Sequence, residues 1–390
     1  MNSSDFPPQP ALPAAPLDPL DAVGHPDPYP YYDRLARAGL HFEPRLKLWV
    51  AAGAAGVKAV LTHPDCRVRP PAEPVPATIA GGSAGQIFGA LVRMNDGARH
   101  AQPKLALQRA LAAVPLALAQ RRAAEIGRRR WDGAALSAWM HAVPVAAMAS
   151  LIGFPEAQLA PLAAWMARFV ACLSPLSSGA QIADAQLAAR ELLASFTALM
   201  RDAAQCHDPA QPTLLALVIA EARAAGWDDA GALLANLVGL LSQTYEASAG
   251  LVGNSVVALV RQPEEERCEP ADAGALVQAV SRLDPPIQNT RRFVARACEV
   301  DGVALEQGQA ILLVLAAASR DPNGGGHPFG FGYGPHACPG HALACALAAG
   351  ALEAVIEQVR ATPQGADYLR ALRWGYRRSL NARIPEFALA

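Results

Sequence analysis

The sequence predicts a mainly α-helical fold in a single domain, with a small β-rich region. Most of the chain alternates Ala- and Leu-rich runs with proline breaks, and strand-like patterns are confined to short stretches. No linker-like interruption follows the first thirty or so of the 390 residues, and no internal repeat is found. Residues 1–26, rich in Pro, Ala and Asp, are predicted to be an extension, followed by one domain over residues 27–390.

The spacing of apolar residues predicts the individual elements in chain order. Helical patterns cover 29–39, 54–62, a run that ends at 113, several runs between 116 and 225, and a long run at 228–261. Strand patterns cover 40–51 and 310–317, and the second of these runs on into a helix. Residues 67–80 are punctuated by prolines, which predicts an irregular loop.

Composition and charge exclude several classes of protein. With 52% hydrophobic and 17% charged residues the chain can bury a large core, and its net charge of -1 gives no indication of a nucleic-acid or acidic-membrane partner. The seven cysteines are odd in number and form no Cys-x-x-Cys pair, which favours reduced thiols in a cytosol. No signal peptide or membrane anchor is visible at the N-terminus, so a cytoplasmic protein is expected.

A glycine-rich loop near the C-terminal end presents one cysteine at the start of an apolar helical run. Its residues are Phe331, Gly332, Tyr333, Gly334, Pro335, His336, Ala337, Cys338, Pro339, Gly340, His341, Ala342, Leu343 and Ala344. A thiolate there would face backbone N–H groups and a helix N-terminus, which together stabilise negative charge. The loop is therefore a candidate metal site; the alternative is a buried free cysteine after a glycine turn.

This loop fits the pattern Phe-Gly-x-Gly-x-His-x-Cys-x-Gly-x-x-Leu-Ala at every specified position, and there the chain resembles the cytochromes P450, the heme-thiolate monooxygenases. The resemblance implies the cytochrome P450 fold, with heme b as cofactor and the Cys338 thiolate as axial ligand of its iron. The other loop positions that it assigns to heme binding are Phe331, Gly332, Gly334, His336 and Gly340.

The same resemblance implies further groups that bind the heme propionates. His100 and Lys104, one helical turn apart, occupy positions where a histidine and usually an arginine fulfil this role. Arg292 falls where the family places a propionate arginine, with Arg291 as the near alternative. For His100 and Lys104, a solvated surface pair is the other interpretation.

The long helix at 228–261 resembles the family helix that crosses above the heme, but its central residues differ. Most members have a small pair, an acid and a threonine there. In this chain Gln243 and Thr244 replace the small pair, Glu246 keeps the acid, and Ala247 stands in place of the threonine. Because alanine cannot donate a proton, we expect water, substrate, or a side chain such as Gln243, Thr244 or Ser248 to take part. Alternatively, these polar side chains bond to the helix backbone and shape the pocket.

A second departure affects the buried Glu-Arg-Arg cluster of the family. Arg282 matches the arginine of the Glu-x-x-Arg motif, but Ala279 occupies the glutamate position. The segment between Pro322 and the cysteine loop is too short for the usual meander, which supplies the third member. Arg282 would then need backbone carbonyls or another acid as partners, and weaker retention of heme is expected. The alternative is that Arg282 is an ordinary surface residue.

Pro339 follows the cysteine directly and has no backbone N–H to direct at the sulfur. Loss of a donor would leave the sulfur more electron-rich and lower the iron reduction potential. The alternative interpretation is that Pro339 simply starts the following helix.

The resemblance implies a soluble, bacterial-type monooxygenase that oxidises a small organic molecule, and small bacterial members of this kind often serve secondary metabolism. It would use O2 and electrons from NAD(P)H through a separate ferredoxin and ferredoxin reductase, because the chain contains no flavin or iron–sulfur reductase motif. Some such members accept substrates tethered to a carrier protein. Two alternatives stay open: a heme-thiolate enzyme with peroxide-driven, coupling, desaturation or rearrangement chemistry, and a non-catalytic heme or partner-binding protein.

Overall fold

The computed structural model describes residues 14–205, 212–262, 272–361 and 365–389. The helices are α1 (Tyr29–Ala36), α2 (Ala54–Thr62), α3 (Ser83–Ala90), α4 (Ala98–Ala112), α5 (Leu116–Arg129), α6 (Leu136–Ile152), α7 (Glu156–Val170), α8 (Gly179–Gln205), α9 (Leu214–Ala224), α10 (Ala230–Arg261), α12 (Ala273–Leu283), α13 (Leu315–Arg320), α14 (His341–Arg360) and α15 (Gly365–Ala371). The strands are β1 (His41–Glu43), β2 (Leu48–Ala51), β3 (Cys66–Arg67), β4 (Thr290–Val294), β5 (Cys298–Val300), β6 (Val303–Leu305), β7 (Ala310–Leu313), β8 (Leu372–Tyr376) and β9 (Pro385–Leu389).

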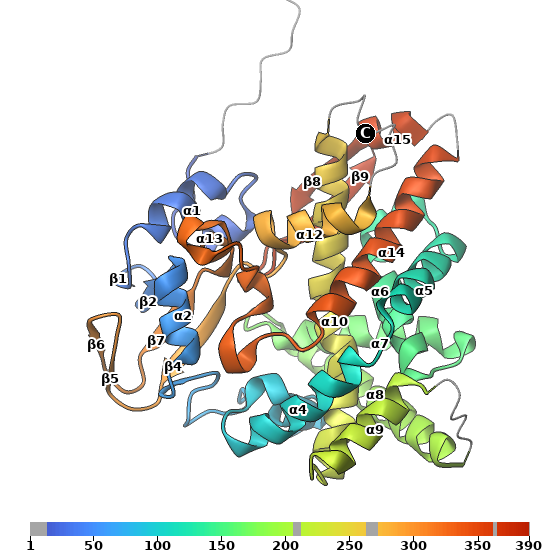
Figure 1. Cartoon of the computed structure of the whole chain (residues 1–390), viewed down its shortest axis with the longest axis horizontal. Helices are drawn as coiled ribbons and strands as arrows, with labels where there is room; N and C mark the ends of the chain where they lie inside the picture. The colour runs from blue at the N-terminus through green and yellow to red at the C-terminus, as the bar shows by residue number, and fades with distance from the viewer. Residues whose placement is uncertain (1–13, 206–211, 263–271, 362–364, 390) are drawn as a thin grey trace, which may run out of the picture.

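Helix α10 is the axis of the helical body and packs against α3, α6, α7, α8, α12 and α14 (Figure 1). Asp229 caps its first turn, because the Asp229 side chain accepts a hydrogen bond of 2.9 Å from the N–H of Ala232. Small residues let its neighbours approach closely: a methyl group at Gly253 would lie 2.6 Å from Pro385 Cγ and 2.9 Å from Met140 Sδ. The long predicted helix is thus confirmed as a core element.

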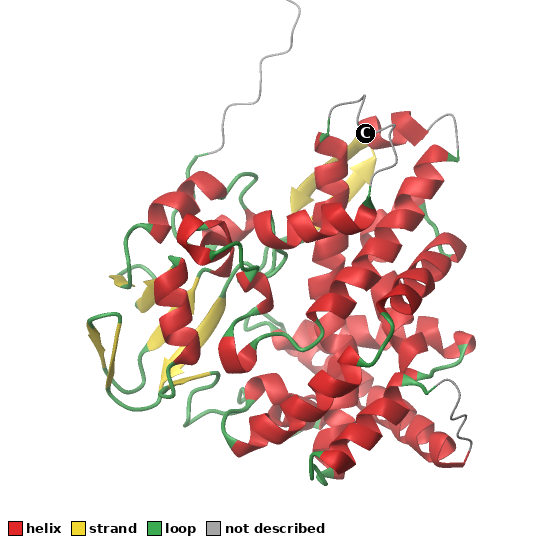
Figure 2. Cartoon of the chain, viewed as in Figure 1, coloured by secondary structure: helices red, strands yellow, loops and turns green. Residues whose placement is uncertain are grey.

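Most of the strands lie on one side of the helical body, whereas β8 and β9 lie apart from them near α15, as Figure 1 and Figure 2 show. Five of them form a mixed sheet in the order β1-β2-β7-β4-β3, in which β2 and β7 run parallel with Trp49 opposite Ile311. The β5–β6 and β8–β9 pairs form two separate two-stranded sheets. This architecture confirms the mainly α-helical fold with a small β-rich region, and α2 spans the predicted residues 54–62.

A buried ion pair joins distant parts of the chain. Arg383 is fully buried, and its Nε donates to Asp284 Oδ1 over 2.9 Å at the end of α12. Its other nitrogens donate to backbone oxygens of Val23, His25 and Pro26, so residues before α1 are attached to the domain. The predicted boundary between residues 26 and 27 stays a prediction, although the packed structure already begins before it.

Among the described residues, α14 belongs to the one helical segment that is long and apolar enough to cross a membrane by composition alone. Within the fold, 67% of its apolar window is buried, and α14 packs against α5 and α10. It therefore has the burial of a core helix.

Candidate active site

The loop before α14 has a fixed backbone that presents Cys338. The N–H of Cys338 donates to the carbonyl of Phe331 over 2.7 Å, which closes the loop. Gly332 has a φ of +74°, and a methyl group there would lie 2.8 Å from the carbonyl oxygen of His336. Gly334 also has a positive φ, of +63°. Both positions therefore require glycine, which explains the spacing of the motif.

The Cys338 thiol is accessible although protein surrounds it. It lies on the wall of a hollow of about 350 Å³, whose other lining residues are Lys104, Gln108, Gly334, Pro335, Ala337 and Pro339. Burial raises the pKa of this thiol, while the Gly340 N–H and the Lys104 ammonium oppose the rise. The sulfur thus keeps one backbone donor, from Gly340, although Pro339 has none to offer. The structure thus agrees that Pro339 gives no hydrogen bond to the sulfur. That the sulfur is more electron-rich for this reason stays a prediction.

Basic and aromatic side chains gather beside this loop. The His100 ring, in the first turn of α4, lies 4.1 Å from the His336 ring between centroids. Lys104, one turn later, donates to the carbonyl of Ala337. His336 Nε2 lies 3.0 Å from Asp96 Oδ1, and Arg292 in β4 is buried nearby. The fold therefore brings together four predicted heme-binding residues from three distant segments.

The electrostatics of this cluster favour an added acidic group. Burial and the neighbouring His336 and Lys104 lower the pKa of His100 to about 4. Burial also lowers the pKa values of Lys104 and Arg292. Lys104 and Arg292 thus confine positive charge beside His100, and carboxylates such as the propionates of a heme would stabilise it.

The polar residues in the middle of α10 differ in exposure. Gln243 is exposed although Ser242 and Thr244 on either side are buried. Its Nε2 donates to Gly239 O over 3.0 Å, and the Thr244 hydroxyl donates to Leu240 O over 2.8 Å. Ala247 is half-buried and Ser248 is buried. The backbone-bonded interpretation therefore describes Thr244 well, whereas Gln243 also borders open space.

Glu246 has a partner that the sequence did not indicate. Its Oε1 lies 2.6 Å from Nη2 of Arg377, which follows β8 near the end of the chain. Arg93, between α3 and α4, also interacts electrostatically with this carboxylate. Burial lowers the pKa of Arg93, and the negative charge of Glu246 opposes that change. The Nε of Arg93 is buried and has no hydrogen-bond partner within the described residues. An acidic group of the heme or of a substrate would satisfy it.

These features fit a heme. An accessible thiol provides an axial ligand, the basic cluster matches two carboxylates, and the orphaned Arg93 nitrogen offers a further donor. The residues that sequence reasoning missed are Arg93 and Arg377. Neither lies in a motif, and only packing places them beside Glu246.

The expectation that backbone carbonyls or another acid pair with Arg282 is wrong. Its side chain is exposed and makes no hydrogen bond or ion pair among the residues that the structure describes. Ala279, three positions earlier, carries no charge, so Arg282 has no acid at the position where the family has its glutamate. Arg320 instead lies over the Tyr29 ring, 4.3 Å from its centroid, and donates to Leu283 O. The buried pair Arg383–Asp284 holds the end of α12 in this chain.

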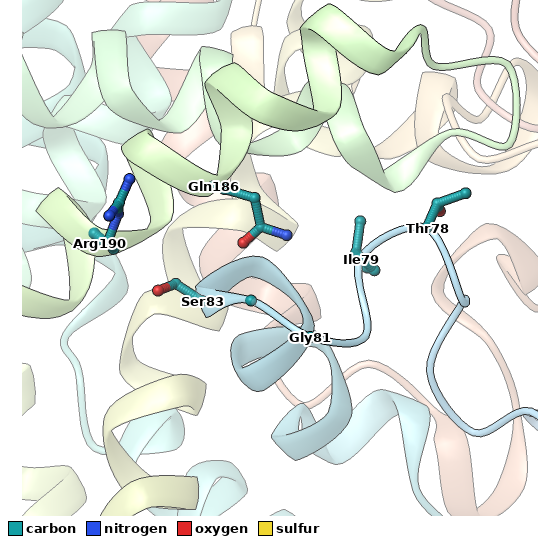
Figure 3. A pocket seen from close by; sticks show the side chains of 7 residues that line it. Thr78, Ile79, Gly81, Ser83, Gln186 and Arg190 are labelled. Atoms are coloured by element: carbon teal, nitrogen blue, oxygen red, sulfur yellow. The ribbon is translucent and has the colours of Figure 1, made fainter.

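A second hollow, of about 450 Å³, lies between α8 and the segment before α3 (Figure 3). The side chains of Gln186 and Arg190 come from α8, and Thr78, Ile79 and Ser83 come from the facing segment. Gln186 Oε1 also accepts a hydrogen bond of 2.9 Å from the N–H of Ala84, which ties α8 to the start of α3. Residues 67–80, predicted as irregular loop, thus lead into the border of a polar opening.

Comparison with known proteins shows several similar chains. No family model matches the chain. Cytochrome P450 144 of Mycobacterium tuberculosis is 28% identical over 351 residues, which cover 82% of this chain and 79% of the relative. The biotin biosynthesis cytochrome P450 of Bacillus subtilis is 25% identical over 254 residues, covering 61% of this chain and 62% of the relative.

Solved structures agree on the fold. P450BioI, in complex with an acyl carrier protein ligated to hexadec-9Z-enoic acid, matches with a TM-score of 0.74 at 21% identity, over 93% of this chain and 97% of that chain. CalO2 matches with a TM-score of 0.73 at 21% identity, over 96% and 98%. Together with the cysteine loop and a sequence match over four fifths of the chain, this fold places the protein in the cytochrome P450 family, as a heme-thiolate oxygenase.

Proposed function

We propose that this enzyme oxidises a small organic molecule as a monooxygenase, with O2 and electrons from NAD(P)H delivered by a separate ferredoxin and ferredoxin reductase. The observation that carries the proposal is the accessible thiol of Cys338 beside the basic cluster of His100, Lys104, Arg292 and His336. Separate electron carriers are proposed because the chain holds no flavin or iron–sulfur reductase motif of its own.

The chain's residues divide the work between holding the cofactor and moving protons. Cys338 would ligate the iron of heme b, within a loop whose backbone Gly332, Gly334 and Gly340 shape. When bound, the heme supplies oxygen activation, which no side chain can provide. His100, Lys104, Arg292 and His336 would donate to its propionates, and Phe331, stacked on the His341 ring at 3.8 Å, supports the loop.

Glu246 is the proposed proton carrier. Its carboxylate is held by Arg377 at 2.6 Å and is half-exposed, so it can exchange protons with water while keeping its position. Ala247 offers no hydroxyl, and the Thr244 hydroxyl is already bonded to Leu240 O. Because Gln243 is exposed, we propose that it orients a water near the reacting centre, with Ser248 as a buried alternative.

The substrate is proposed to be a molecule of secondary metabolism, and the enzyme is proposed to act on it in the cytoplasm. The hollow bordered by Arg190 and Gln186 is a candidate entry, because it lies where residues 67–80 meet α8. P450BioI is seen in complex with a loaded acyl carrier protein, which supports a carrier-tethered substrate as one form that this enzyme would accept. The domain proposed over residues 27–390 carries the site, and the bonds of Arg383 to Val23, His25 and Pro26 attach the residues just before α1 to it.

A second candidate function is non-hydroxylating heme-thiolate chemistry. It is favoured by Ala247, because an α10 without a free hydroxyl beside Glu246 has fewer proton donors on the helix itself. Peroxide brings its oxygen already reduced, so it needs less proton delivery from the protein. Faster turnover with hydrogen peroxide alone than with ferredoxin, its reductase and NADPH would favour this candidate. Membership of an enzyme family argues against the non-catalytic alternative.

The absorption spectrum of the reduced protein under carbon monoxide tests the site first. Wild-type protein is expected to show the strongly red-shifted Soret band of a thiolate-ligated heme, and Cys338→Ser is expected to lose it. Cys172→Ser is the matched control, since Cys172 is a buried thiol whose Sγ bonds to Phe169 O far along the chain from the loop. No heme in the wild type, or a normal band in Cys338→Ser, would overturn the assignment.

A further inference from the structure

Three metal-ligating side chains meet in the β-rich region, outside the active site. His63 follows α2, Cys66 begins β3 and Cys298 begins β5, and their ligand atoms all lie within 4.8 Å of one another. Figure 1 shows α2 beside the β5–β6 hairpin at the edge of the molecule, and both β3 and β5 contact α2. The His-Pro-Asp-Cys turn places two of these ligands three residues apart, which is a spacing common in zinc sites.

The arrangement matches the size of a metal centre. Three atoms no more than 4.8 Å apart can all lie within about 2.8 Å of one central point, close to zinc–sulfur and zinc–nitrogen bond lengths of about 2.0–2.3 Å. Small side-chain rotations therefore suffice to close the site. Two sulfurs and one imidazole form a donor set that suits zinc, and hard ions such as magnesium prefer oxygen.

Backbone hydrogen bonds fix the turn that carries His63 and Cys66. The N–H of Cys66 donates to His63 O over 3.1 Å, and the N–H of Ala295 donates to Asp65 O over 2.8 Å. The N–H of Asp65 lies 3.2 Å from His63 Nδ1, so this nitrogen carries the lone pair, and a metal there would replace a weak hydrogen bond. The Asp65 side chain is already held by Arg296 at 2.8 Å.

From this geometry we propose that His63, Cys66 and Cys298 bind one zinc ion, with a water molecule in the fourth position. Cys66 is buried, whereas His63 and Cys298 are half-buried, so one side of the ion would face solvent. On binding, each thiol loses its proton and each sulfur forms a bond to zinc, so two protons are released and no oxidation state changes.

Such an ion would join the turn after α2 to the β5–β6 hairpin. That hairpin is a separate two-stranded sheet, and two-stranded sheets have little stability of their own. A bond from Cys298 to zinc would attach the hairpin to Cys66, whose strand pairs with β4. The role of the ion is therefore structural, and it is independent of the heme.

Zinc content of the heme-loaded enzyme tests the proposal. Protein incubated with zinc chloride under reducing conditions and then desalted should retain about one zinc per heme. Cys66→Ser, Cys298→Ser and His63→Ala should each bind zinc at least about tenfold more weakly in competition with a fluorescent zinc chelator. Cys172→Ser should bind like the wild type. Each variant is compared at equal heme content, so a misfolded variant is recognised.

Zinc-edge X-ray absorption of the wild type provides a readout that needs no variant. Two sulfur and one nitrogen neighbours, completed by one oxygen, are expected. The proposal is overturned if the wild type retains no zinc, if the serine variants retain it as well as the wild type, or if the absorption spectrum shows no sulfur neighbour. Peptide mass mapping that finds a disulfide between Cys66 and Cys298 under reducing conditions would also overturn it, because zinc binds thiolates.

Discussion

Replacing Asp284 by alanine should destabilise the protein strongly, because it isolates the charge of Arg383. The Arg383 side chain is 0% exposed and that of Asp284 is 17% exposed. After the substitution, the Arg383 guanidinium keeps the carbonyls of Val23, His25 and Pro26 but has lost its negative partner. The Tyr29 hydroxyl, which donates to Asp284, also loses its acceptor.

The expected cost of this change is about 3–5 kcal/mol, the range for breaking a buried ion pair by removing one member. For a chain of 390 residues, an unfolding entropy of about 2.1 cal/mol/K per residue gives about 0.8 kcal/mol/K. The corresponding drop in midpoint temperature is about 4–6 °C. Arg383→Met should cost less, since Asp284 can still bond to Tyr29 and reach water. The double variant should lose less than the sum of both.

Urea unfolding followed by tryptophan fluorescence measures these differences, with the melting temperature as a second probe. Arg122→Ala is the control, because Arg122 and Glu125 form an exposed pair on one helix whose removal should cost about 0.3 kcal/mol. If Asp284→Ala costs no more than this control, or if the two losses in the double variant simply add, the buried pair does not hold the chain ends together as argued.

Three further predictions follow from single contacts. Gln243→Ala should lower the product formed per NADPH, whereas Thr244→Ala, whose hydroxyl is bonded within α10, should change it little; equal effects would contradict the assignment. Gly350→Ala should lower the urea midpoint markedly because the added methyl would overlap the backbone of α5, whereas Gly375→Ala, with open space around it, should not; similar midpoints would refute the close packing. Burial lowers the pKa of His141 below its usual 6.5, so the unfolded chain takes up the proton first and stability should fall as the pH drops below about 6.5. His141→Phe should flatten that part of a stability-against-pH curve, and an unchanged slope would rule the group out as its source.

Residue patterns predicted the local structure on which the candidate site is built. The residues of the cysteine loop are adjacent in the chain, and the positive φ values of Gly332 and Gly334 depend on the loop alone. For the same reason, the long helix α10 and the polar residues within it were predictable. The assignments of individual residues to heme and proton transfer stay predictions, because no comparison tests them.

The partners of charged residues were not predictable in the same way. Arg282 was expected to have an internal partner and is exposed instead, because no acid is supplied at Ala279. The partner of Glu246 is Arg377, which lies far along the chain in a segment with no motif. Nothing in the sequence indicated that Asp284 would pair with Arg383.

By itself, the sequence determined the fold class, the cysteine loop and the family, because periodicity and short motifs are properties of neighbouring residues. Only the tertiary structure decided which side chains meet: Glu246 with Arg377, Asp284 with Arg383, and the cluster of His63, Cys66 and Cys298. The physical reason is that such contacts depend on how helices and strands pack. Residues that are distant in the chain come within bonding distance only when the whole core is formed.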